Sequence, residues 1–228
     1  MSLSTEEKDH LIQKLSISCK EMQLSISDQQ KTKLIDYLDN LLKWNKTYNL
    51  TAIRHADQGL IQHIVDCLSV INPLNQFIEK NQIGHPRILD VGSGGGLPGV
   101  VLAIICQNAK VTCIDTVEKK TSFIRQMSSV LKLDNLNAIH ARIEKLEPLH
   151  ADIVISRAFA SLQDFAELAG KHVSERGKLI GMKGKNPAAE QSDLLKKGDW
   201  TIEKIEPLHV PELHAERCLV WMHRKEIK

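Results

Sequence analysis

The chain has 228 residues, of which 42% are hydrophobic and 25% are charged, and its formal net charge is +2. This composition provides enough apolar side chains for a core and corresponds to one large domain, or to a domain with an extension. The small positive charge permits a nucleic-acid partner without predicting one, since a basic stripe on one face would not show in the total.

The cysteines and the N-terminal residues bear on the environment of the protein. The 5 cysteines are odd in number, scattered, and mostly inside apolar runs, which is typical of reduced thiols in a core. The sequence contains no C-x-x-C and no Cys/His pair that suggests a metal site, so we expect no metal. Because the N-terminus is polar and no apolar run approaches the length of a membrane span, we predict a cytoplasmic protein with no membrane partner.

The chain divides into a helical N-terminal part and a strand–helix alternation, with a join near Asn81 to Pro86. Residues 1–80 are predicted to form a helical extension packed on a sheet, and residues 81–228 to form the main domain. The expected helices run from Thr5 to about Glu21, onward from a cap at Ser27 or Asp28, and over the apolar residues between Ile61 and Ile71, ending near Asn72-Pro73.

After the join, short apolar runs alternate with helical patterns. Strands are expected at 87–91, 111–115, 136–140, 152–156, 178–183, 201–206 and 217–223, and helices at about 98–107, 118–132, 161–173 and 188–197. This alternation is typical of an α/β fold with a doubly wound, mostly parallel sheet, which binds ligands at the carboxyl ends of its strands. Val210-Pro211 leaves no room for a helix between the last two strands, so these should form an antiparallel hairpin at the sheet edge.

The segment from Ile88 to Gly99 is the strongest indication of function. An apolar strand leads directly into glycines at positions 92, 94, 95 and 96, where the backbone can turn sharply and lie against a ligand without interference from a Cβ atom. Pro98 suits the first turn of the following helix, whose N-terminus then faces the pocket. A strand, a glycine turn and a helix in this order predict a nucleotide-type cofactor loop.

Two classes of ligand use such a loop. The dinucleotide fingerprint occurs literally from Gly94 to Gly99, but the glycine that closes the turn directly after the strand is Gly92. The Asp-x-Gly-x-Gly-x-Gly arrangement that begins at Asp90 resembles the first motif of the S-adenosylmethionine-dependent methyltransferases. Asp115 ends the next strand, roughly 20 residues beyond the loop, where a carboxylate can accept both hydroxyls of a ribose. Asp115 therefore predicts a ribose in either class of ligand.

Further candidate residues follow the third and fourth strands. Ile143 could lie against the face of an adenine and Glu144 could contact its edge, although Glu144 would look the same at the start of a surface turn. Arg157 comes directly after a buried run, where an arginine needs an anionic partner or a wet cleft. Phe159 either stacks on a base or packs in the core, and the core position is favoured.

Other candidates lie after the fifth strand and in the helical part. Lys183 and Lys185 flank a glycine turn and suit RNA phosphates, although a solvated loop would look the same. His63 and Asp66 lie three residues apart on one helical face, and they either orient each other near the cleft or form a buried hydrogen-bonded pair. Trp44 lies near a helix end, where anchoring a cap over the sheet is favoured over contact with RNA.

Several segments occur in an order that resembles one bacterial family. They are Trp44-Asn-Lys-Thr-Tyr-Asn-Leu-Thr51, His63-Ile-Val-Asp66, the loop from Asp90 to Gly99, Ser156-Arg157-Ala158-Phe159-Ala160 and Lys183-Gly184. From about residue 15 to 224 the chain is similar to the glucose-inhibited division protein B family, the small-subunit ribosomal RNA guanine-N7 methyltransferases. The glycine loop is generic to methyltransferases, whereas the segments around Trp44 and Arg157 are specific to this family. The chain departs from the family at Gln62, where many members have a basic residue, and at Cys67, where a serine is usual.

The resemblance implies a class I, Rossmann-like fold with S-adenosyl-L-methionine as the cofactor. It implies small-subunit (16S) ribosomal RNA as the partner, within an assembled or assembling 30S subunit, and a monomeric enzyme. The expected substrate contacts are His63, Phe159, Lys183 and Lys185, and the expected catalytic residue is Arg157. The cofactor contacts predicted from the loop and the resemblance together are Gly92, Gly94, Gly96, Leu97, Asp115, Ile143, Glu144 and Arg157.

The implied reaction has a chemistry that fits these residues. N7 of guanine carries an in-plane lone pair that is unprotonated at neutral pH, and the methyl donor is a sulfonium whose sulfur leaves as a neutral thioether, so no general base is needed. Catalysis is then expected from in-line positioning, which can supply up to ~7–11 kcal/mol, and Arg157 is expected to bridge the cofactor carboxylate and the substrate. Two alternatives stay open: a nicotinamide-dependent oxidoreductase, favoured by the literal glycine match, and a non-catalytic ribosome-assembly factor on the same fold.

Overall fold

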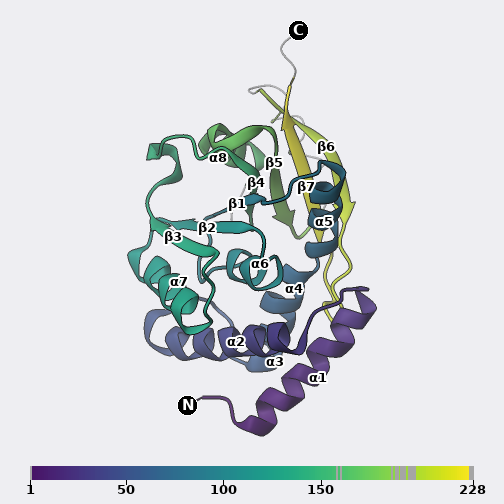
Figure 1. Cartoon of the computed structure of the whole chain (residues 1–228), viewed down its shortest axis with the longest axis vertical. Coiled ribbons are helices and arrows are strands. Elements are labelled where there is room, and N and C mark those ends of the chain that lie inside the picture. Colours follow the sequence, from purple (N-terminus) through teal and green to yellow (C-terminus); the bar gives the residue numbers. More distant parts are fainter. Residues whose placement is uncertain are drawn as a thin grey trace.

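A twisted sheet forms the centre of this computed structural model, which describes residues 2–157, 159, 161–185, 187, 190, 194 and 199–225. The strands follow the order β3-β2-β1-β4-β5-β7-β6 (Figure 1). Their bounds are β1 (Arg87–Val91), β2 (Lys110–Asp115), β3 (Leu136–His140), β4 (Ala151–Ser156), β5 (Val173–Lys183), β6 (Trp200–Pro207) and β7 (Cys218–Arg224). The first five strands pair in parallel, while β7 is antiparallel to both β5 and β6. The predicted doubly wound, mostly parallel sheet with an antiparallel hairpin at its edge is therefore confirmed.

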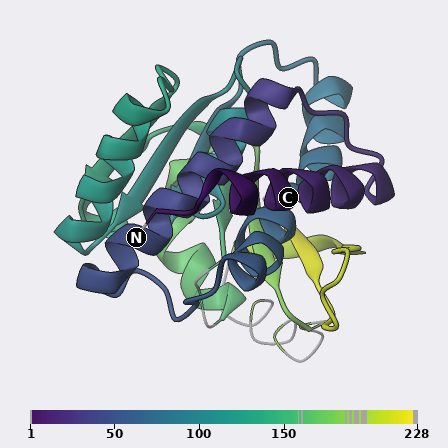
Figure 2. The same cartoon turned by 90° about the horizontal axis from the view of Figure 1, so that it is seen from below.

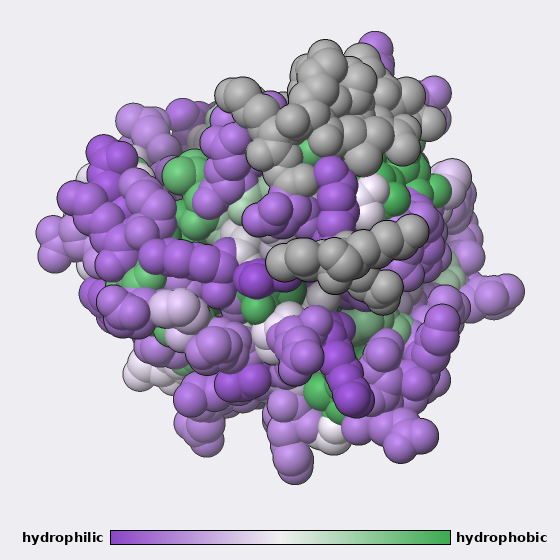
Figure 3. All heavy atoms as spheres, turned by 90° about the horizontal axis from the view of Figure 1, so that it is seen from above, coloured by the Kyte–Doolittle hydropathy of each residue, from purple (hydrophilic) through white to green (hydrophobic). Residues whose placement is uncertain are grey.

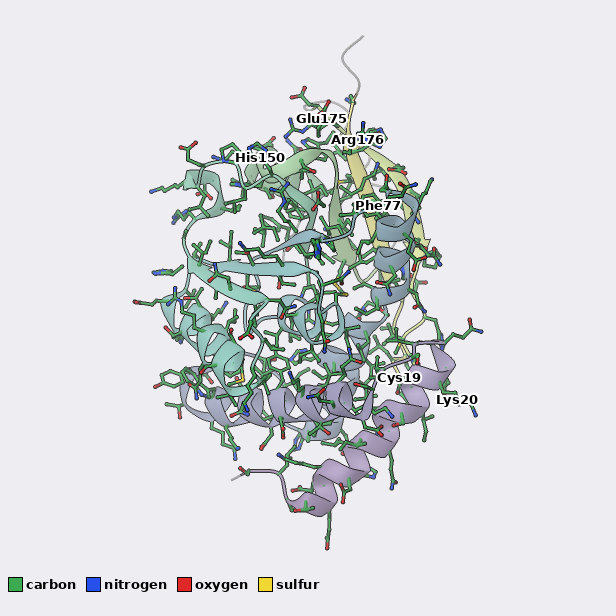
Figure 4. All side chains as sticks on the ribbon, in the orientation of Figure 1. Cys19, Lys20, Phe77, His150, Glu175 and Arg176 are labelled. Atoms are coloured by element: carbon green, nitrogen blue, oxygen red, sulfur yellow. The ribbon has the colours of Figure 1, made fainter. Side chains whose placement is uncertain are left out.

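One strand begins earlier than the sequence predicted. β5 starts at Val173 rather than at 178, and its first part includes the exposed side chains of Glu175 and Arg176, which Figure 4 labels near one end of the molecule. The sequence did not predict this first part of the strand, because the prediction relied on a run of buried apolar side chains and these positions are polar.

The first two helices match their predictions and show why they begin where they do. α1 (Thr5–Glu21) and α2 (Asp28–Tyr48) each start with a capping box, formed by Ser4 and Glu7 in α1 and by Ser27 and Gln30 in α2. In each box the serine accepts a hydrogen bond from a free backbone N–H of the first turn, and the longer side chain accepts one from the backbone N–H of the serine.

The third helix differs from its prediction. α3 (Ala56–Gly59), a π-helix η1 (Leu60–Val65) and α4 (Asp66–Leu68) follow one another, and α5 (Ile71–Lys80) then continues past Pro73. The prediction that the helix ends near Asn72-Pro73 was wrong, because Pro73 lies in the first turn of α5, where a backbone N–H has no partner within the helix. Hydrophobic periodicity gave no sign of the π-helix.

The remaining helices lie near their predicted positions. They are α6 (Gly99–Ile105), α7 (Glu118–Val130) and α8 (Leu162–Ala169), together with the 3-10 turns η2 (Ile143–Lys145) and η3 (Gly170–His172). The helix predicted at 188–197 falls mostly outside the described residues. No helix among the described residues is long and apolar enough to cross a membrane.

Two hydrophobic clusters cover the two faces of the sheet. One cluster packs α1, α2, η1, α4, α5, α6 and α7 against one face of the sheet. The other packs α8 and the 3-10 turn η2 against the opposite face. In β1, Ile88 belongs to the first cluster while Leu89 and Val91 belong to the second, as expected for a strand that is buried on both sides. Figure 2 shows α1 lying across α2, and Figure 3 shows that the surface seen from above is mostly hydrophilic, with small separate apolar patches.

The N-terminal helices share their core with the sheet. The Tyr37 hydroxyl of α2 donates to the Gly95 carbonyl of the glycine loop at 2.7 Å. The Phe77 ring of α5, labelled in Figure 4, has its centroid 5.6 Å from that of Trp221 on β7. The Trp44 ring lies 5.3 Å from that of the buried Phe123, so the prediction that Trp44 anchors the helical cap is confirmed. The boundary between an extension and a main domain at residues 80 and 81 stays a prediction.

Candidate functional site

The glycine loop between β1 and α6 has the geometry that its sequence predicts. Gly92, Gly94 and Gly96 have φ angles of 70°, 58° and 97°, which favour glycine. A Cβ atom on Gly94 would have no neighbour within 4 Å, and Gly94 lines a cavity, so the open space above it faces a ligand position. A Cβ atom on Gly99 would instead lie 2.2 Å from the Cys113 sulfur, which explains why the helix must begin with glycine.

Asp115 stands at the carboxyl end of β2 and braces this loop. One carboxylate oxygen accepts a hydrogen bond from the Gly94 backbone N–H and the other accepts one from Val117, both at 2.9 Å. Lys120 lies 3.6 Å from the first of these oxygens. Because each carboxylate oxygen has two lone pairs, Asp115 keeps acceptor sites for the hydroxyls of a ribose while it holds the loop.

Two cavities meet along the glycine loop. The first, which we call the loop cavity, has a volume of about 240 Å³ and is lined by Gly92 to Gly95, Leu97, Leu41, Leu50, Thr51, His63, Lys120 and Arg157. The second, the Asp115 cavity, has a volume of about 340 Å³ and is lined by residues that include Asp115, Ile143, Glu144 and Phe159. Gly92 and Lys120 line both cavities, so the two form one trough along the carboxyl edge of β1 and β2.

A third cavity continues the trough on the other side of Arg157. This arginine cavity has a volume of about 340 Å³ and is lined by Gln62, His63, Asp66, Arg157, Met182, Lys183, Gly184 and Arg217. His63 and Arg157 also line the loop cavity, so their side chains form the wall between the two. The trough therefore has one part around the glycine loop and Asp115, and another part where Arg157, Lys183 and Arg217 gather.

Arg157 follows β4 and is held by the helical part of the chain. Its Nη1 donates to the Asp66 carboxylate at 3.2 Å and to the Gln62 carbonyl at 3.1 Å, and its Nη2 lies 3.4 Å from His63 Nδ1. Burial opposes the charge of Arg157, but Cys67 and Asp66 beside it raise the pKa of the guanidinium above its usual value. The anionic partner that the sequence required for Arg157 is therefore Asp66.

Two buried titratable groups near the loop have shifted pKa values of opposite sign. Burial, with the nearby Arg157 charge, lowers the pKa of His63 to about 4, so its imidazole is neutral at pH 7. Burial raises the pKa of Asp90 to about 7, although the Gly99 backbone N–H donates to it at 2.8 Å. Its other carboxylate oxygen has no hydrogen-bond partner among the described residues. The site thus holds a weakly basic imidazole beside a permanently charged guanidinium.

A sequence model of one protein family matches residues 30–220, and that family is described as rRNA small subunit methyltransferase G. The chain belongs to this family. The prediction of an S-adenosylmethionine-dependent methyltransferase that acts on small-subunit ribosomal RNA is therefore confirmed, and the nicotinamide-dependent alternative is set aside.

Curated relatives agree with this family over nearly the whole chain. The chain is 54% identical over 215 residues to a protein of Bordetella pertussis named ribosomal RNA small subunit methyltransferase G, covering 94% of each. It is 41% identical over 225 residues to the protein of the same name from Methylibium petroleiphilum, covering 99% of this chain and 100% of that one.

Solved structures show the same fold at low sequence identity. A ribosomal protein L11 methylase from Lactobacillus delbrueckii subsp. bulgaricus matches 75% of this chain and 81% of its own, with a TM-score of 0.52 and 13% identity. TrmN from Thermus thermophilus matches 72% of this chain and 53% of its own, with a TM-score of 0.52 and 15% identity. These likenesses support the predicted class I methyltransferase fold of this member of the methyltransferase G family.

The structure brings most of the predicted site residues of this methyltransferase into the trough. The predicted cofactor residues Gly92, Gly94, Leu97, Asp115, Ile143, Glu144 and Arg157 line the loop cavity or the Asp115 cavity. Gly96 is buried beneath the loop, where its Cβ would lie 2.4 Å from Val100, so it shapes the turn. The assignment of these residues to the cofactor stays a prediction.

The predicted substrate residues are spread more widely. His63 and Lys183 line the arginine cavity, whereas Lys185 is exposed and is not among the residues that line it. The Phe159 ring stacks on the buried Phe165 at 4.8 Å and lines the Asp115 cavity, which fits the favoured core position better than contact with a substrate base. His63 and Asp66 meet at Arg157, and the hydroxyl of Thr51 lies 2.7 Å from His63 Nε2.

Sequence reasoning missed Arg217. It lies directly before β7, and its Nε donates to the second carboxylate oxygen of Asp66 at 2.8 Å. A signal was available, because β7 is antiparallel and its first residue, Cys218, pairs with Lys183 at the carboxyl end of β5. The start of an antiparallel strand lies at the same sheet edge as the ends of its parallel neighbours, so a cation there belongs to the same site as Arg157.

Proposed function

We propose that this chain transfers the methyl group of S-adenosylmethionine to N7 of one guanine in small-subunit ribosomal RNA. The substrate is the assembled or assembling 30S subunit, and the enzyme acts as a monomer in the cytoplasm. The observation that carries the proposal is the position of Arg157, whose side chain forms the wall between the loop cavity and the arginine cavity. A methyl group must pass between two ligands at a place where their cavities meet.

The residues of the loop cavity and the Asp115 cavity suit the proposed cofactor. Gly94 leaves open space that a Cβ atom would fill, and Asp115 presents carboxylate oxygens suited to ribose hydroxyls. Ile143 and Glu144 lie in the same cavity as Asp115, with an apolar surface for an adenine face and a carboxylate for its edge. Arg157 is positioned to pair with the carboxylate of the methionine part.

The reaction requires the protein to position the cofactor and the guanine, and it requires no proton transfer. S-adenosylmethionine supplies a methyl group bound to a positively charged sulfur, and N7 of guanine has a lone pair that is available at neutral pH. His63, whose pKa is lowered to about 4, is neutral at pH 7 and would not act as a strong base. Arg157 keeps its proton, and its side chain lines the cavities on both sides of the wall. The role of the protein is then to hold the two ligands in line.

The arginine cavity suits an RNA substrate. Arg157, Arg217 and Lys183 face it, and phosphate groups are the anions that RNA presents at every nucleotide. The net charge of the whole chain is only +2, so binding to bare RNA should be weak and folded ribosomal structure should be required.

The test is methyl transfer from labelled S-adenosylmethionine to small ribosomal subunits from a strain that lacks this gene. Mapping by N7-specific aniline cleavage should locate the label at a single guanine, and deproteinised RNA should accept less label than intact subunits. Label at another atom or in another RNA contradicts the proposal. Binding of the cofactor without any transfer to subunits or their precursors would instead favour an assembly factor.

A further inference from the structure

Asp66 joins two arginines that come from distant parts of the chain. Its side chain is 3% exposed, and it is the first residue of α4, directly after the π-helix. One carboxylate oxygen lies 3.2 Å from Arg157 Nη1, and the other lies 2.8 Å from Arg217 Nε. Each guanidinium thus has its own oxygen, so the carboxylate fixes the distance and orientation between the two groups.

The backbone of the π-helix also holds the Arg157 guanidinium in place. The Gln62 carbonyl accepts a hydrogen bond from Arg157 Nη1 at 3.1 Å. π-helical turns are rare and frequently lie at functional sites, and this one places Gln62, His63 and Asp66 on the same side of Arg157. The helical part of the chain therefore holds the arginine that stands between the two cavities.

The charges of the cluster favour an anionic ligand. Two guanidinium groups share one carboxylate, and His63 beside them is neutral at pH 7. Lys183, at the same cavity, lies 3.1 Å from Glu190, so that pair adds no net charge. The arginine cavity therefore keeps about one positive charge, and guanidinium groups bind phosphate with good geometry.

We propose that Asp66 is a positioning residue for the RNA, which holds Arg157 and Arg217 so that both guanidinium groups face one backbone phosphate in the arginine cavity. This proposal rests on the proposed function, because it names the part of the RNA that enters beside the methyl-transfer position. Asp66 itself touches neither ligand and acts through the two arginines.

A matched control is available on α2. Asp39 is 3% exposed and also binds two cations, with Lys43 at 2.9 Å and Lys8 at 3.7 Å from its carboxylate. These lysines belong to α2 and α1, and neither lines the arginine cavity. Asp39→Asn should therefore report what losing a buried carboxylate with two cations does to stability alone.

The experiment measures three quantities for the wild type, Asp66→Asn and Asp39→Asn: the free energy of unfolding, the Kd for S-adenosylmethionine, and kcat and KM with unmethylated small subunits. We expect Asp66→Asn to lose about 10- to 100-fold in kcat/KM, since small misplacements at a reacting centre have such effects. Its cofactor Kd should change by a smaller factor than kcat/KM, because the glycine loop and Asp115 are left in place and Arg157 makes only one of the expected cofactor contacts. Asp39→Asn should lose comparable stability and keep wild-type kinetics. Equal kinetics for the two variants overturns the proposal, as does a loss confined to cofactor binding.

A second variant keeps the test informative if Asp66→Asn does not fold. Arg217→Gln should raise KM for subunits and lower the slope of log KM against log salt concentration by about one, the change expected when one phosphate contact is lost. If Asp66→Asn does fold, it should add less in the Arg217→Gln background than it does alone, because one of the two arginines that it positions is then missing. An unchanged salt slope, or fully additive effects, overturns the proposal. Failure of the wild type to methylate subunits would overturn the proposed function instead.

Discussion

The two halves of the trough are built in different ways. The half along the glycine loop centres on one continuous segment, Asp90 to Gly99, and side chains from other elements, such as Leu41 and Lys120, complete its lining. The arginine cavity is built from side chains of separate segments, including Asp66, Arg157 and Arg217. The centre of the first half is therefore shaped by local backbone geometry, whereas the second half depends on long-range contacts that only the complete fold brings together.

The difference has a counterpart in electrostatics. Near the loop the Asp115 carboxylate lies beside Lys120, while Arg157, Lys183 and Arg217 gather at the arginine cavity. Ribose hydroxyls suit the Asp115 carboxylate, and a polyanion suits the three cations. Changes in one half should therefore affect one ligand more than the other.

Loss of Arg157 should have the largest effect, because this side chain belongs to both halves. We expect Arg157→Ala to lower kcat/KM for methyl transfer by about 100-fold or more, since it removes the group that orients both ligands. It should also destabilise the fold by about 3 kcal/mol, because Asp66 keeps only one of its two cations. Steady-state kinetics and urea unfolding check the two effects. Normal turnover with normal cofactor affinity contradicts the role of Arg157.

A side chain on Gly94 should weaken cofactor binding in the half along the glycine loop and leave substrate binding in the arginine cavity unchanged. Gly94→Val fills the open space above the loop and places a branched residue at a φ of 58°, a strain of about 1–2 kcal/mol. We expect at least tenfold weaker binding of S-adenosylmethionine by calorimetry, or about 1.4 kcal/mol. Gly84→Val controls for a valine placed in open space away from the trough, because a Cβ there also has no neighbour within 4 Å, although Gly84 lacks the positive φ of Gly94. Equal cofactor affinity for both variants argues against this placement.

The opposite pKa shifts of Asp90 and His63 should appear in the pH dependence of stability. The pKa of Asp90 is raised from 3.8 to about 7, so its contribution is fully present below pH 3.8 and is lost as the pH rises toward 7. The pKa of His63 is lowered from 6.5 to about 4, so its contribution is present above pH 6.5 and is lost as the pH falls toward 4.

Single variants separate these two contributions. Between pH 4 and 7, Asp90→Asn should make the free energy of unfolding rise more steeply with pH than in the wild type, by up to about 1.4 kcal/mol per pH unit. His63→Gln should change that slope in the opposite direction between pH 4 and 6.5. Urea unfolding at several pH values measures both slopes. Slopes that match the wild type in either variant contradict the corresponding shift.

Loss of Lys183 should have a smaller effect, which is confined to binding of the RNA substrate at the arginine cavity. Its side chain lies 3.2 Å from the Phe159 carbonyl and is paired with Glu190, so it is held at the edge of the arginine cavity. We expect Lys183→Ala to raise KM for subunits by roughly three- to tenfold at moderate salt, with little change in cofactor Kd. Lys185→Ala, at an exposed position, should change KM less. A larger effect at Lys185 would move the RNA path toward the exposed turn.

The fold and the conformation of the glycine loop were predicted from the sequence because both depend on local patterns. The run of glycines after a buried strand specifies its own turn, and alternating strands and helices lead to one topology. The arginine cavity was predicted only in part, because the contact between Asp66 and Arg217 spans much of the chain. The π-helix that aims Gln62 at Arg157 has no periodic signal in the sequence, so the bond between them could not be predicted.

The most direct test of two separable halves compares Gly94→Val with Arg217→Gln in a single series. Both the Kd for S-adenosylmethionine and the KM for unmethylated small subunits, at saturating cofactor, are measured for each variant. The account predicts that Gly94→Val raises the cofactor Kd and leaves the subunit KM near the wild-type value. Arg217→Gln should raise the subunit KM and leave the cofactor Kd unchanged. If each variant changes both constants to a similar degree, the trough is one coupled site and the division proposed here is wrong.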